Sequence, residues 1–395
     1  MRVDDGAGLC PSDGAFSQRP DREYSDAQDR KPGGQDMWPD RRILDMLGIE
    51  LPIIQAPMAG AGLADLAVAV SEAGGLGSLP CALLGPEQLR NQFGIIRQRT
   101  SRPINVNFFC HRPPEPDAAR EAHWQRGLAP YYRELGLDPE VAAPTSNRAP
   151  FDAAFCDLVE ELRPEVVSFH FGLPERPLLD RVAATGARIL SSATTVDEAR
   201  WLEDAGCHAI IAQGFEAGGH RGMFRTDDVA MQIGTFALVP QVVDAVRVPV
   251  IAAGGIADGR GIAAAFMLGA SAVQIGTAYL FTPEATIAEP HRRALAVGPD
   301  RATALTNVFT GRPARGIVNR IMREIGPIAP NAPPFPLAGG ALAPLRSASE
   351  PEGSEDFMSL WSGQAAGLGR AMPANELTRH LANEALARLP QEPMP

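Results

Sequence analysis

The chain has 395 residues, 45% of them hydrophobic, which suffices for one large domain with additions or for two domains. Its formal net charge of −11 and its lack of a basic stripe argue against a nucleic-acid-binding surface. No apolar run reaches the ~18 residues of a membrane span, and the N-terminus lacks the apolar segment of a signal peptide.

The five cysteines are scattered, without a CxxC or Cys/His spacing. This argues against a disulfide framework and a structural zinc site, and it favours buried free thiols in a reducing compartment. We therefore expect a cytoplasmic protein without a metal site and without nucleic-acid or membrane partners.

Lys31 is the only lysine, and it lies in a polar N-terminal tract. Without another lysine the remaining chain cannot form a Schiff base, which excludes lysine-dependent aldolases and pyridoxal phosphate enzymes. It also cannot complete a Walker-type phosphate loop. Genomic base composition can explain the excess of arginine, but the exclusion does not depend on its cause.

Residues 1–40 are predicted to form a disordered N-terminal extension, because the first 36 are rich in Asp, Gly, Ser, Arg and Pro and show no apolar period. From about residue 43, short apolar runs alternate with segments of helical spacing. The predicted strands are 53–55, 76–79, 104–109, 166–171, 188–192, 209–212, 250–253 and 272–275. Residues 110–150 interrupt this rhythm with many prolines and are predicted to be an insertion with a helical piece.

Eight strands that alternate with helices predict a (β/α)8 TIM barrel over residues 41–281, close to the usual ~250 residues. A doubly wound open sheet is the alternative, but its phosphate-binding turn would more naturally come first in the chain. Residues 282–395 show no strand period. They are predicted to form a mostly helical cap, on the substrate side, over one end of the barrel.

The last two predicted strands end in turns suited to a phosphate group. The strand 250–253 runs into Gly254-Gly255, and Asp258 can cap the following helix. The strand 272–275 runs into Gly276-Thr277, which offers bare backbone and a hydroxyl group. Glycine-rich turns after the final two strands are where barrels of this type hold phosphates.

The other polar residues at predicted strand ends are amides and histidines. They are Gln55, Asn105, Asn107, His170, Gln213, His220 and Gln274. The chain shows no carboxylate pair of glycosidase type and no HxH or HExxH spacing for a metal. Such a set suits a planar heterocycle with a phosphate, together with one acid/base group.

These segments resemble the nitronate monooxygenase family (formerly 2-nitropropane dioxygenases), and specifically its class I members. The matching blocks are IIQAPMAG at 53–60, SFHFG at 168–172, GFEAGGHRG at 214–222, GRGIAAAFMLGASAVQIGT at 259–277 and FTGRPARGIVNR at 309–320. The first block is shared with other flavin barrels, whereas the third and fourth together, in this order and spacing, are specific.

The resemblance implies an FMN-dependent oxidation of alkyl nitronates or nitroalkanes with O2, giving a carbonyl compound and nitrite. It implies His170 as the catalytic base and His220 as a candidate substrate contact. The residues that it implies for FMN are Ala56, Pro57, Met58, Asn107, Gln213, Gly218, Gly219, Gly254, Gly255, Gln274, Gly276 and Thr277. A lone histidine in an apolar strand is more often a core residue, but the place of His170 at a strand end favours catalysis.

One departure from the family concerns the substrate pocket. Class I relatives are expected to supply tyrosine and lysine side chains from the C-terminal part, whereas no tyrosine follows Tyr279 here. Phe335, Trp361, Arg312 or Arg320 could take their place. Two other functions remain open: an NAD(P)H-dependent FMN reductase acting on quinones or enoyl thioesters, and a flavin-free phosphosugar enzyme. A homodimer is a further expectation.

Overall fold

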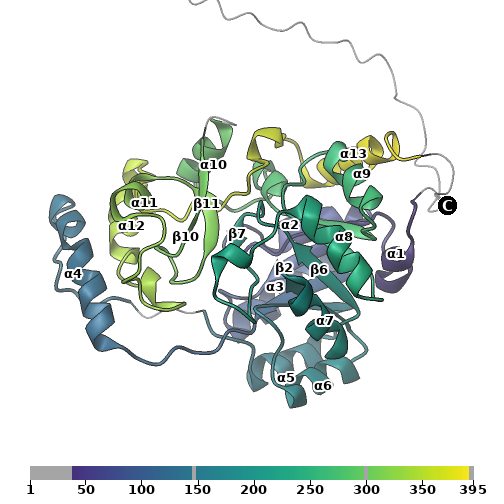
Figure 1. Ribbon diagram of the computed structural model, residues 1–395, viewed down its shortest axis with the longest axis horizontal. Coiled ribbons are helices and arrows are strands. Elements are labelled where there is room, and N and C mark those ends of the chain that lie inside the picture. Colours follow the sequence, from purple (N-terminus) through teal and green to yellow (C-terminus); the bar gives the residue numbers. More distant parts are fainter. Residues whose placement is uncertain (1–37, 145–147, 298–300, 391–395) are drawn as a thin grey trace, which may run out of the picture.

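The structure is a computed structural model that describes residues 38–144, 148–297 and 301–390 (Figure 1). The predicted N-terminal extension lies outside the described residues except for its last three. Of these, Trp38 is buried, and its ring centroid lies 5.3 Å from that of Phe266, so these residues pack on the barrel. Among the described residues, no helix combines the length and the apolar character that crossing a membrane requires.

Eight parallel strands form the centre of the molecule, in the hydrogen-bonded order β1-β9-β8-β6-β5-β4-β3-β2. A parallel bridge between Ile54 and Leu76 brings β1 next to β2, which closes the sheet into the predicted barrel. The strands are β1 (Ile53–Gln55), β2 (Gly77–Pro80), β3 (Ile104–Phe109), β4 (Val166–His170), β5 (Arg188–Ala193), β6 (Ala209–Gln213), β8 (Val250–Ala253) and β9 (Ala272–Ile275). Nearly all their residues are buried, as expected for strands covered on both faces.

The helices that follow these strands form the outer ring. They are α2 (Ala64–Glu72), α3 (Pro86–Arg99), α5 (Ala153–Leu162), α6 (Arg176–Ala184), α7 (Val196–Asp204), α8 (Thr235–Ala245), α9 (Gly259–Met267) and α13 (Ala374–Leu386), and α1 (Arg42–Leu47) precedes the barrel. The predicted cap at Asp258 is confirmed, because its carboxylate accepts hydrogen bonds from the main-chain N–H groups of Arg260 and Gly261.

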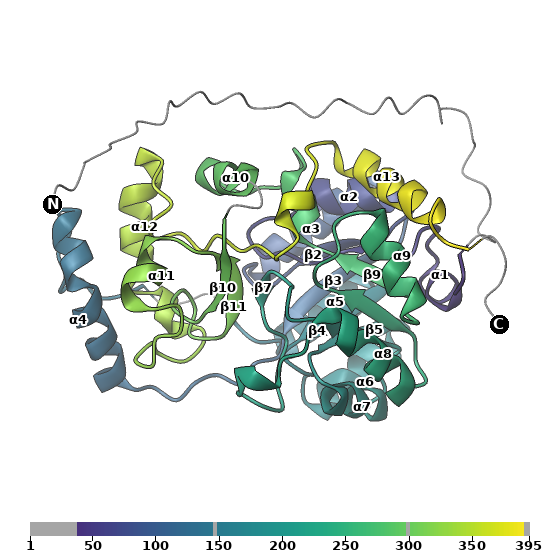
Figure 2. The same cartoon turned by 45° about the horizontal axis from the view of Figure 1, so that its top comes forward.

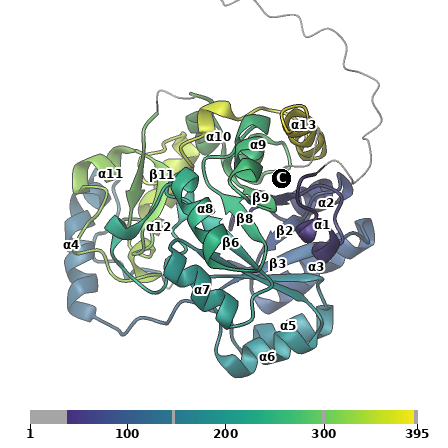
Figure 3. The same cartoon turned by 45° about the vertical axis from the view of Figure 1, so that its right-hand side comes forward.

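Helix α13 completes the ring although it lies about a hundred residues beyond β9 in the chain. It lies beside α9 (Figure 3), where a Cβ atom on Gly259 would come within 2.4 Å of the Glu384 Cβ atom. The main-chain N–H of Ala374 donates to the carboxylate of Glu284 (3.1 Å), so the chain returns to the point where it left the barrel. The predicted boundary after residue 281 stays a prediction, but this packing places α13 with the barrel.

Between β9 and α13 the chain builds a second layer over the barrel (Figure 2). Its elements are η3 (Thr277–Phe281), α10 (Glu289–Ala296), β10 (Thr303–Thr306), β11 (Ala314–Ile317), α11 (Arg320–Ile325), η5 (Leu337–Gly339), α12 (Ala343–Ser349), η6 (Glu350–Glu352) and η7 (Ala366–Leu368). Strands β10 and β11 join β7 (Gly219–His220) in a three-stranded sheet. The sequence shows no strand period for β10 and β11, because each has only four residues and β11 contains Arg315 and Gly316.

The predicted insertion contributes α4 (Ala118–Glu134), which lies against this second layer at the edge of the molecule (Figure 2). The indole N–H of Trp124 donates to the carbonyl of Ala338 (3.1 Å), and the Tyr132 hydroxyl donates to that of Ala341 (2.6 Å). The tyrosines of the insertion therefore pack against the layer, and neither of them lines the pocket described below. A 3₁₀ turn, η2 (Val229–Met231), precedes α8.

Candidate active site

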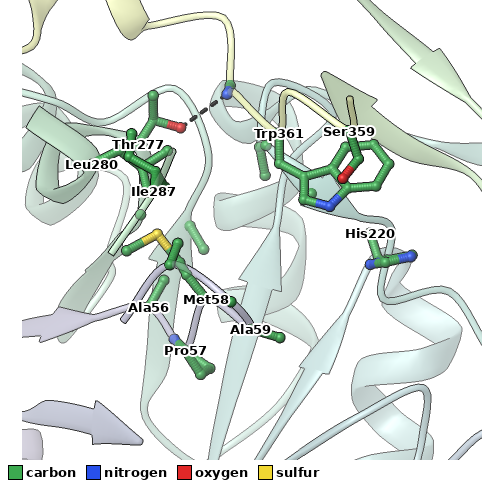
Figure 4. Close-up of a pocket in the computed structure, with 18 of the residues that line it drawn as sticks. Ala56, Pro57, Met58, Ala59, His220, Thr277, Leu280, Ile287, Ser359 and Trp361 are labelled. Atoms are coloured by element: carbon green, nitrogen blue, oxygen red, sulfur yellow. Dashed lines mark hydrogen bonds between the residues drawn. The ribbon is translucent and has the colours of Figure 1, made fainter. Parts of the chain in front are cut away.

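A cavity of about 440 Å³ lies between the carboxyl ends of the barrel strands and the second layer (Figure 4). Every residue that the sequence analysis assigns to the site lines it. These are Ala56, Pro57, Met58, Asn107, His170, Gln213, Gly218, Gly219, His220, Gly254, Gly255, Gln274, Gly276 and Thr277. Residues from seven segments of the chain thus meet at one place, while the contribution of each to ligand binding stays a prediction.

The turns after β8 and β9 expose main chain at one end of this cavity. Gly254 and Gly255 have φ angles of +108° and +71°, a conformation that L side chains rarely adopt. A Cβ atom on Gly254 would also lie 3.0 Å from the main-chain nitrogen of Ala217. The Thr277 hydroxyl oxygen accepts a hydrogen bond from the N–H of Gly363 (2.9 Å; Figure 4), so its own hydrogen is free to point at a ligand.

Three amide side chains line the cavity from β3, β6 and β9. The Nδ2 group of Asn107 donates to Ser168, which leaves the Asn107 Oδ1 atom to accept from a ligand. The Oε1 atom of Gln213 accepts from the N–H of Gly222 (2.8 Å), which fixes the orientation of that amide. The Oε1 atom of Gln274 is buried and has no hydrogen-bond partner within the described ranges. A buried acceptor without a donor is costly, so a ligand that donates to it would be stabilised.

A buried arginine, Arg221, stabilises the glycine-rich loop after β6, and the sequence analysis did not identify it. The Arg221 guanidinium is fully buried and donates to the carbonyls of Gln213 and Gly214 (both 2.7 Å) and to the Gln232 side chain. Glu216 accepts from the N–H and hydroxyl of Thr235 (both 2.8 Å). Both charged groups of this motif therefore brace the loop that carries Gly218 and Gly219.

His170, at the end of β4, has both ring nitrogens engaged. Its Nε2 atom lies 3.2 Å from the main-chain oxygen of His220, and its Nδ1 atom lies 2.6 Å from the Ser192 hydroxyl oxygen. A carbonyl oxygen can only accept, so Nε2 carries the hydrogen and Nδ1 accepts from Ser192. Burial lowers the pKa of His170 to about 3, and the charges of Arg312 and Arg221 add to this effect. The imidazole is therefore neutral at neutral pH.

His220 presents a different arrangement. Its Nε2 atom lies 2.9 Å from the Thr310 hydroxyl, and Nδ1 makes no hydrogen bond to any residue that the structure describes. The ring lines the cavity and lies 5.4 Å from that of Trp361, on the side away from Thr277 and Leu280 (Figure 4). Burial lowers the pKa of His220 well below its ordinary value, and nearby positive charges lower it further. This gives a neutral imidazole with one nitrogen available to a ligand.

Charged and polar residues from outside the barrel strands also line the cavity. Arg148 and Arg346 line it, together with Glu350 and with His291, whose Nε2 atom lies 3.1 Å from the Trp361 carbonyl oxygen. Burial lowers the pKa of His291 to about 4. Arg346 is paired with Glu350 (Nε to Oε2, 2.8 Å), so Arg148, Arg346 and Glu350 together carry one net positive charge, which favours an anionic ligand.

Of the residues suggested as replacements for the family's tyrosine and lysine, Trp361 lines the cavity. Phe335 borders it, because its ring lies 5.3 Å from that of the lining residue His220. The Arg312 guanidinium lies 4.2 Å from the ring centroid of Phe171, which is not a lining residue. Arg320 lies elsewhere, paired with Glu134 and Glu324.

Other lining residues were missed by the sequence analysis. Ser192 lies near the carboxyl end of β5, as His170 does on β4. The search for polar residues at the carboxyl ends of the predicted strands could therefore have identified it. Arg148, His291 and Arg346 lie in connections or second-layer helices, where no strand period marks them. Among the described residues, no group of three or more His, Cys, Asp or Glu side chains is placed to hold a metal ion.

A parallel barrel with a pocket at the carboxyl ends of its strands is the arrangement of a barrel enzyme. The sequence profile described as nitronate monooxygenase matches residues 40–384. The chain belongs to the nitronate monooxygenase family, which is in general flavin-dependent, and it is therefore an oxidoreductase.

Individual relatives agree with this assignment. The chain is 45% identical to a nitronate monooxygenase of Pseudomonas aeruginosa, over 87% of this chain and 98% of the relative. It is 43% identical to one of Paraburkholderia phytofirmans, over 87% and 94%. Among solved structures, a nitroalkane oxidase from Streptomyces ansochromogenes superimposes with a TM-score of 0.80 at 40% identity, over 88% and 98% of the two chains. FabK from Thermotoga maritima gives 0.65 at 29% identity, over 88% and 96%.

Proposed function

We propose that the protein binds FMN in the cavity and oxidises alkyl nitronates with O2 to a carbonyl compound and nitrite. The observation that carries the proposal is one pocket that combines a glycine cradle for a phosphate with a neutral imidazole whose nitrogen faces the remaining space. The comparisons support the same reaction, because the relatives that match most of the chain are named for it. They do not favour the reductase or the phosphosugar enzyme.

The residues present fit FMN. The glycines after β8 and β9, with Thr277, would hold the phosphate through main-chain N–H groups and a hydroxyl, and they leave the space that a side chain would fill. The orphaned Gln274 Oε1 would accept from a hydroxyl or N–H group of the cofactor, and the amides of Asn107 and Gln213 would meet polar atoms of the ring or ribityl chain. When bound, FMN supplies the electron acceptor of the oxidation.

The outer part of the pocket would bind the nitronate. The net positive charge of Arg148 and the Arg346–Glu350 pair favours an anion there, and the histidines stay neutral because burial lowers their pKa. Trp361 and Met58 add apolar surface to the lining of the pocket (Figure 4). A desolvated anion interacts more strongly with the fixed charges around it than it would in bulk water.

A neutral nitroalkane must lose its α-proton before it becomes a nitronate. The sequence analysis assigned this step to His170, and the geometry favours His220, because hydrogen bonds already occupy both nitrogens of His170. The free Nδ1 atom of His220 can accept the proton, and the Thr310 hydroxyl on Nε2 steadies the ring. In this scheme His170 positions His220 by donating a hydrogen bond to its main-chain carbonyl.

The first test is the visible absorption spectrum of the purified protein, followed by O2 uptake with an alkyl nitronate. A flavin spectrum, as isolated or after FMN is added, together with O2 uptake and nitrite formation is the expected result. A colourless protein that fails to bind FMN would overturn the proposal. Under anaerobic conditions, rapid flavin bleaching by NADH but not by nitronate would instead indicate a reductase.

A further inference from the structure

We infer that Ser192 is a positioning residue, whose hydroxyl fixes the tautomer of His170 and through it the main chain that presents His220 to the substrate. The inference rests on the proposed function, since it names a further residue of the same site. The geometry that carries it is a chain of hydrogen bonds from three barrel strands to the glycine-rich loop.

The series of hydrogen bonds begins at Ser192, near the end of β5. Its hydroxyl is 2.6 Å from the Nδ1 atom of His170, and it must be the donor because Nε2 of that ring donates to the His220 carbonyl. In the other tautomer, Nδ1 would carry the hydrogen and the Nε2 lone pair would face a carbonyl oxygen at 3.2 Å. Ser192 therefore stabilises the only tautomer in which His170 can hold His220.

This series of hydrogen bonds ends at the main-chain carbonyl of His220, which accepts a second hydrogen bond from another side chain. The Nε2 group of Gln213 donates to it (2.9 Å), and the other end of this amide accepts from the N–H of Gly222. Two side chains, from β4 and β6, thus fix one peptide group of the loop. Because the His220 ring is attached to that same residue, a shift of the carbonyl moves the nitrogen that faces the substrate.

Gly222 shows how closely this part of the loop approaches Ser192 and His170. A Cβ atom at Gly222 would lie 2.9 Å from Cε1 of His170 and 3.0 Å from Cβ of Ser192. The main chain of Gly222 therefore packs directly against His170 and Ser192 and leaves no space for a side chain. Loss of the Ser192 hydroxyl would leave the Nδ1 atom of His170 without its side-chain donor and so weaken the preference for this tautomer.

The test compares Ser192→Ala and Ser192→Cys with Ser191→Ala. Ser191 is the matched control, because its hydroxyl is equally buried on the same strand but donates to the carbonyls of Phe169 and Gly172 and does not line the cavity. The first readout is the ring ¹⁵N spectrum of histidine-labelled protein, with the His170 signals assigned from His170→Gln. The second is kcat and KM of the FMN-loaded enzyme with a nitroalkane across pH.

We expect the wild type and Ser191→Ala to show the Nε2–H tautomer of His170, and Ser192→Ala to show a mixture. The kcat of Ser192→Ala should fall about 10- to 100-fold with KM changed less than about twofold, because orientation and not binding is lost. Because a thiol is a weaker donor than a hydroxyl, the kcat of Ser192→Cys should lie between those of the wild type and Ser192→Ala. An unchanged tautomer in Ser192→Ala, or an equal loss of kcat in Ser191→Ala, would overturn the inference. If the wild type oxidises no nitronate, the proposed function fails while the ¹⁵N spectra still decide the role of Ser192.

Discussion

Acid should destabilise this protein at a pH where few carboxylates titrate. Four histidines lie in or beside the pocket, and burial lowers the pKa of each: to about 4 for His111 and His291, to about 3 for His170, and well below the ordinary value for His220. In the unfolded chain each titrates near ~6.5. The stability that comes from keeping them neutral is therefore fully present above that pH and is lost as the pH falls toward the pKa values of the folded protein.

The size of the effect follows from the number of protons taken up on unfolding. At a pH of about 5.5 each unfolded histidine is roughly nine-tenths protonated and the folded ones are almost uncharged, so unfolding binds about 3 to 4 protons. The free energy of unfolding should then fall by roughly 4–5 kcal/mol per pH unit, from a total that is ~5–15 kcal/mol for most domains. Carboxylates with lowered pKa values, such as Asp40 and Asp258, act only at lower pH.

Urea denaturation between about pH 5.5 and 7.5, without added FMN, measures this slope. His291→Gln should reduce it by about one proton, or ~1.4 kcal/mol per pH unit. Substitution of the exposed His123 by glutamine is the matched control and should leave the slope unchanged. A slope below that of a single proton, or an equal effect of the two substitutions, would refute the argument that the pocket histidines are held neutral.

Three further outcomes are expected. Gly254→Ala should weaken FMN binding at least ~10-fold in a fluorescence titration, because the φ angle of +108° and the contact with Ala217 disfavour a side chain. Gly94→Ala is the control, since a Cβ atom at Gly94 would have no neighbour within 4 Å. Wild-type affinity of Gly254→Ala would contradict the prediction. His220→Asn should lower O2 uptake with a neutral nitroalkane by ~10²–10⁴-fold and with a preformed nitronate much less, whereas equal losses would mean that His220 is not the proton acceptor. Arg221→Met should cost about 1–3 kcal/mol of unfolding free energy in urea, since three buried acceptors lose their donor. Arg225→Met, at an exposed ion pair, should cost less than ~1 kcal/mol, and a similar loss in both would refute the bracing role of Arg221.

The barrel could be predicted from the sequence because its signals are local. The bounds of β1, β3, β8 and β9 match the predicted runs, since each is a short apolar stretch bounded by Gly, Pro or polar residues. The three-stranded sheet could not be predicted, because β7 has two residues and its partner β11 lies more than ninety residues further along the chain. The helix that closes the ring was also not placed there, because the second layer separates it from β9.

The candidate site divides in the same way. Residues at strand ends could be predicted because parallel strands bring their carboxyl ends to one face. Arg148 and Arg346 reach this face from segments without strand rhythm, so only the three-dimensional structure brings them there. The tautomer of His170 depends on contacts with β5 and with the loop, which no sequence pattern encodes.

The hydrogen bond between Ala374 and Glu284 has a consequence for how such a molecule can change. Because the chain leaves the barrel and returns to it at the same place, the two ends of residues 285–373 lie close together on the barrel. We call this segment the cassette. We expect that exchange of this cassette between homologues, together with α4, which packs on it, would alter which compound is oxidised while the barrel is kept. The same route delays closure of the ring during synthesis, since α13 is made only after residues 285–373.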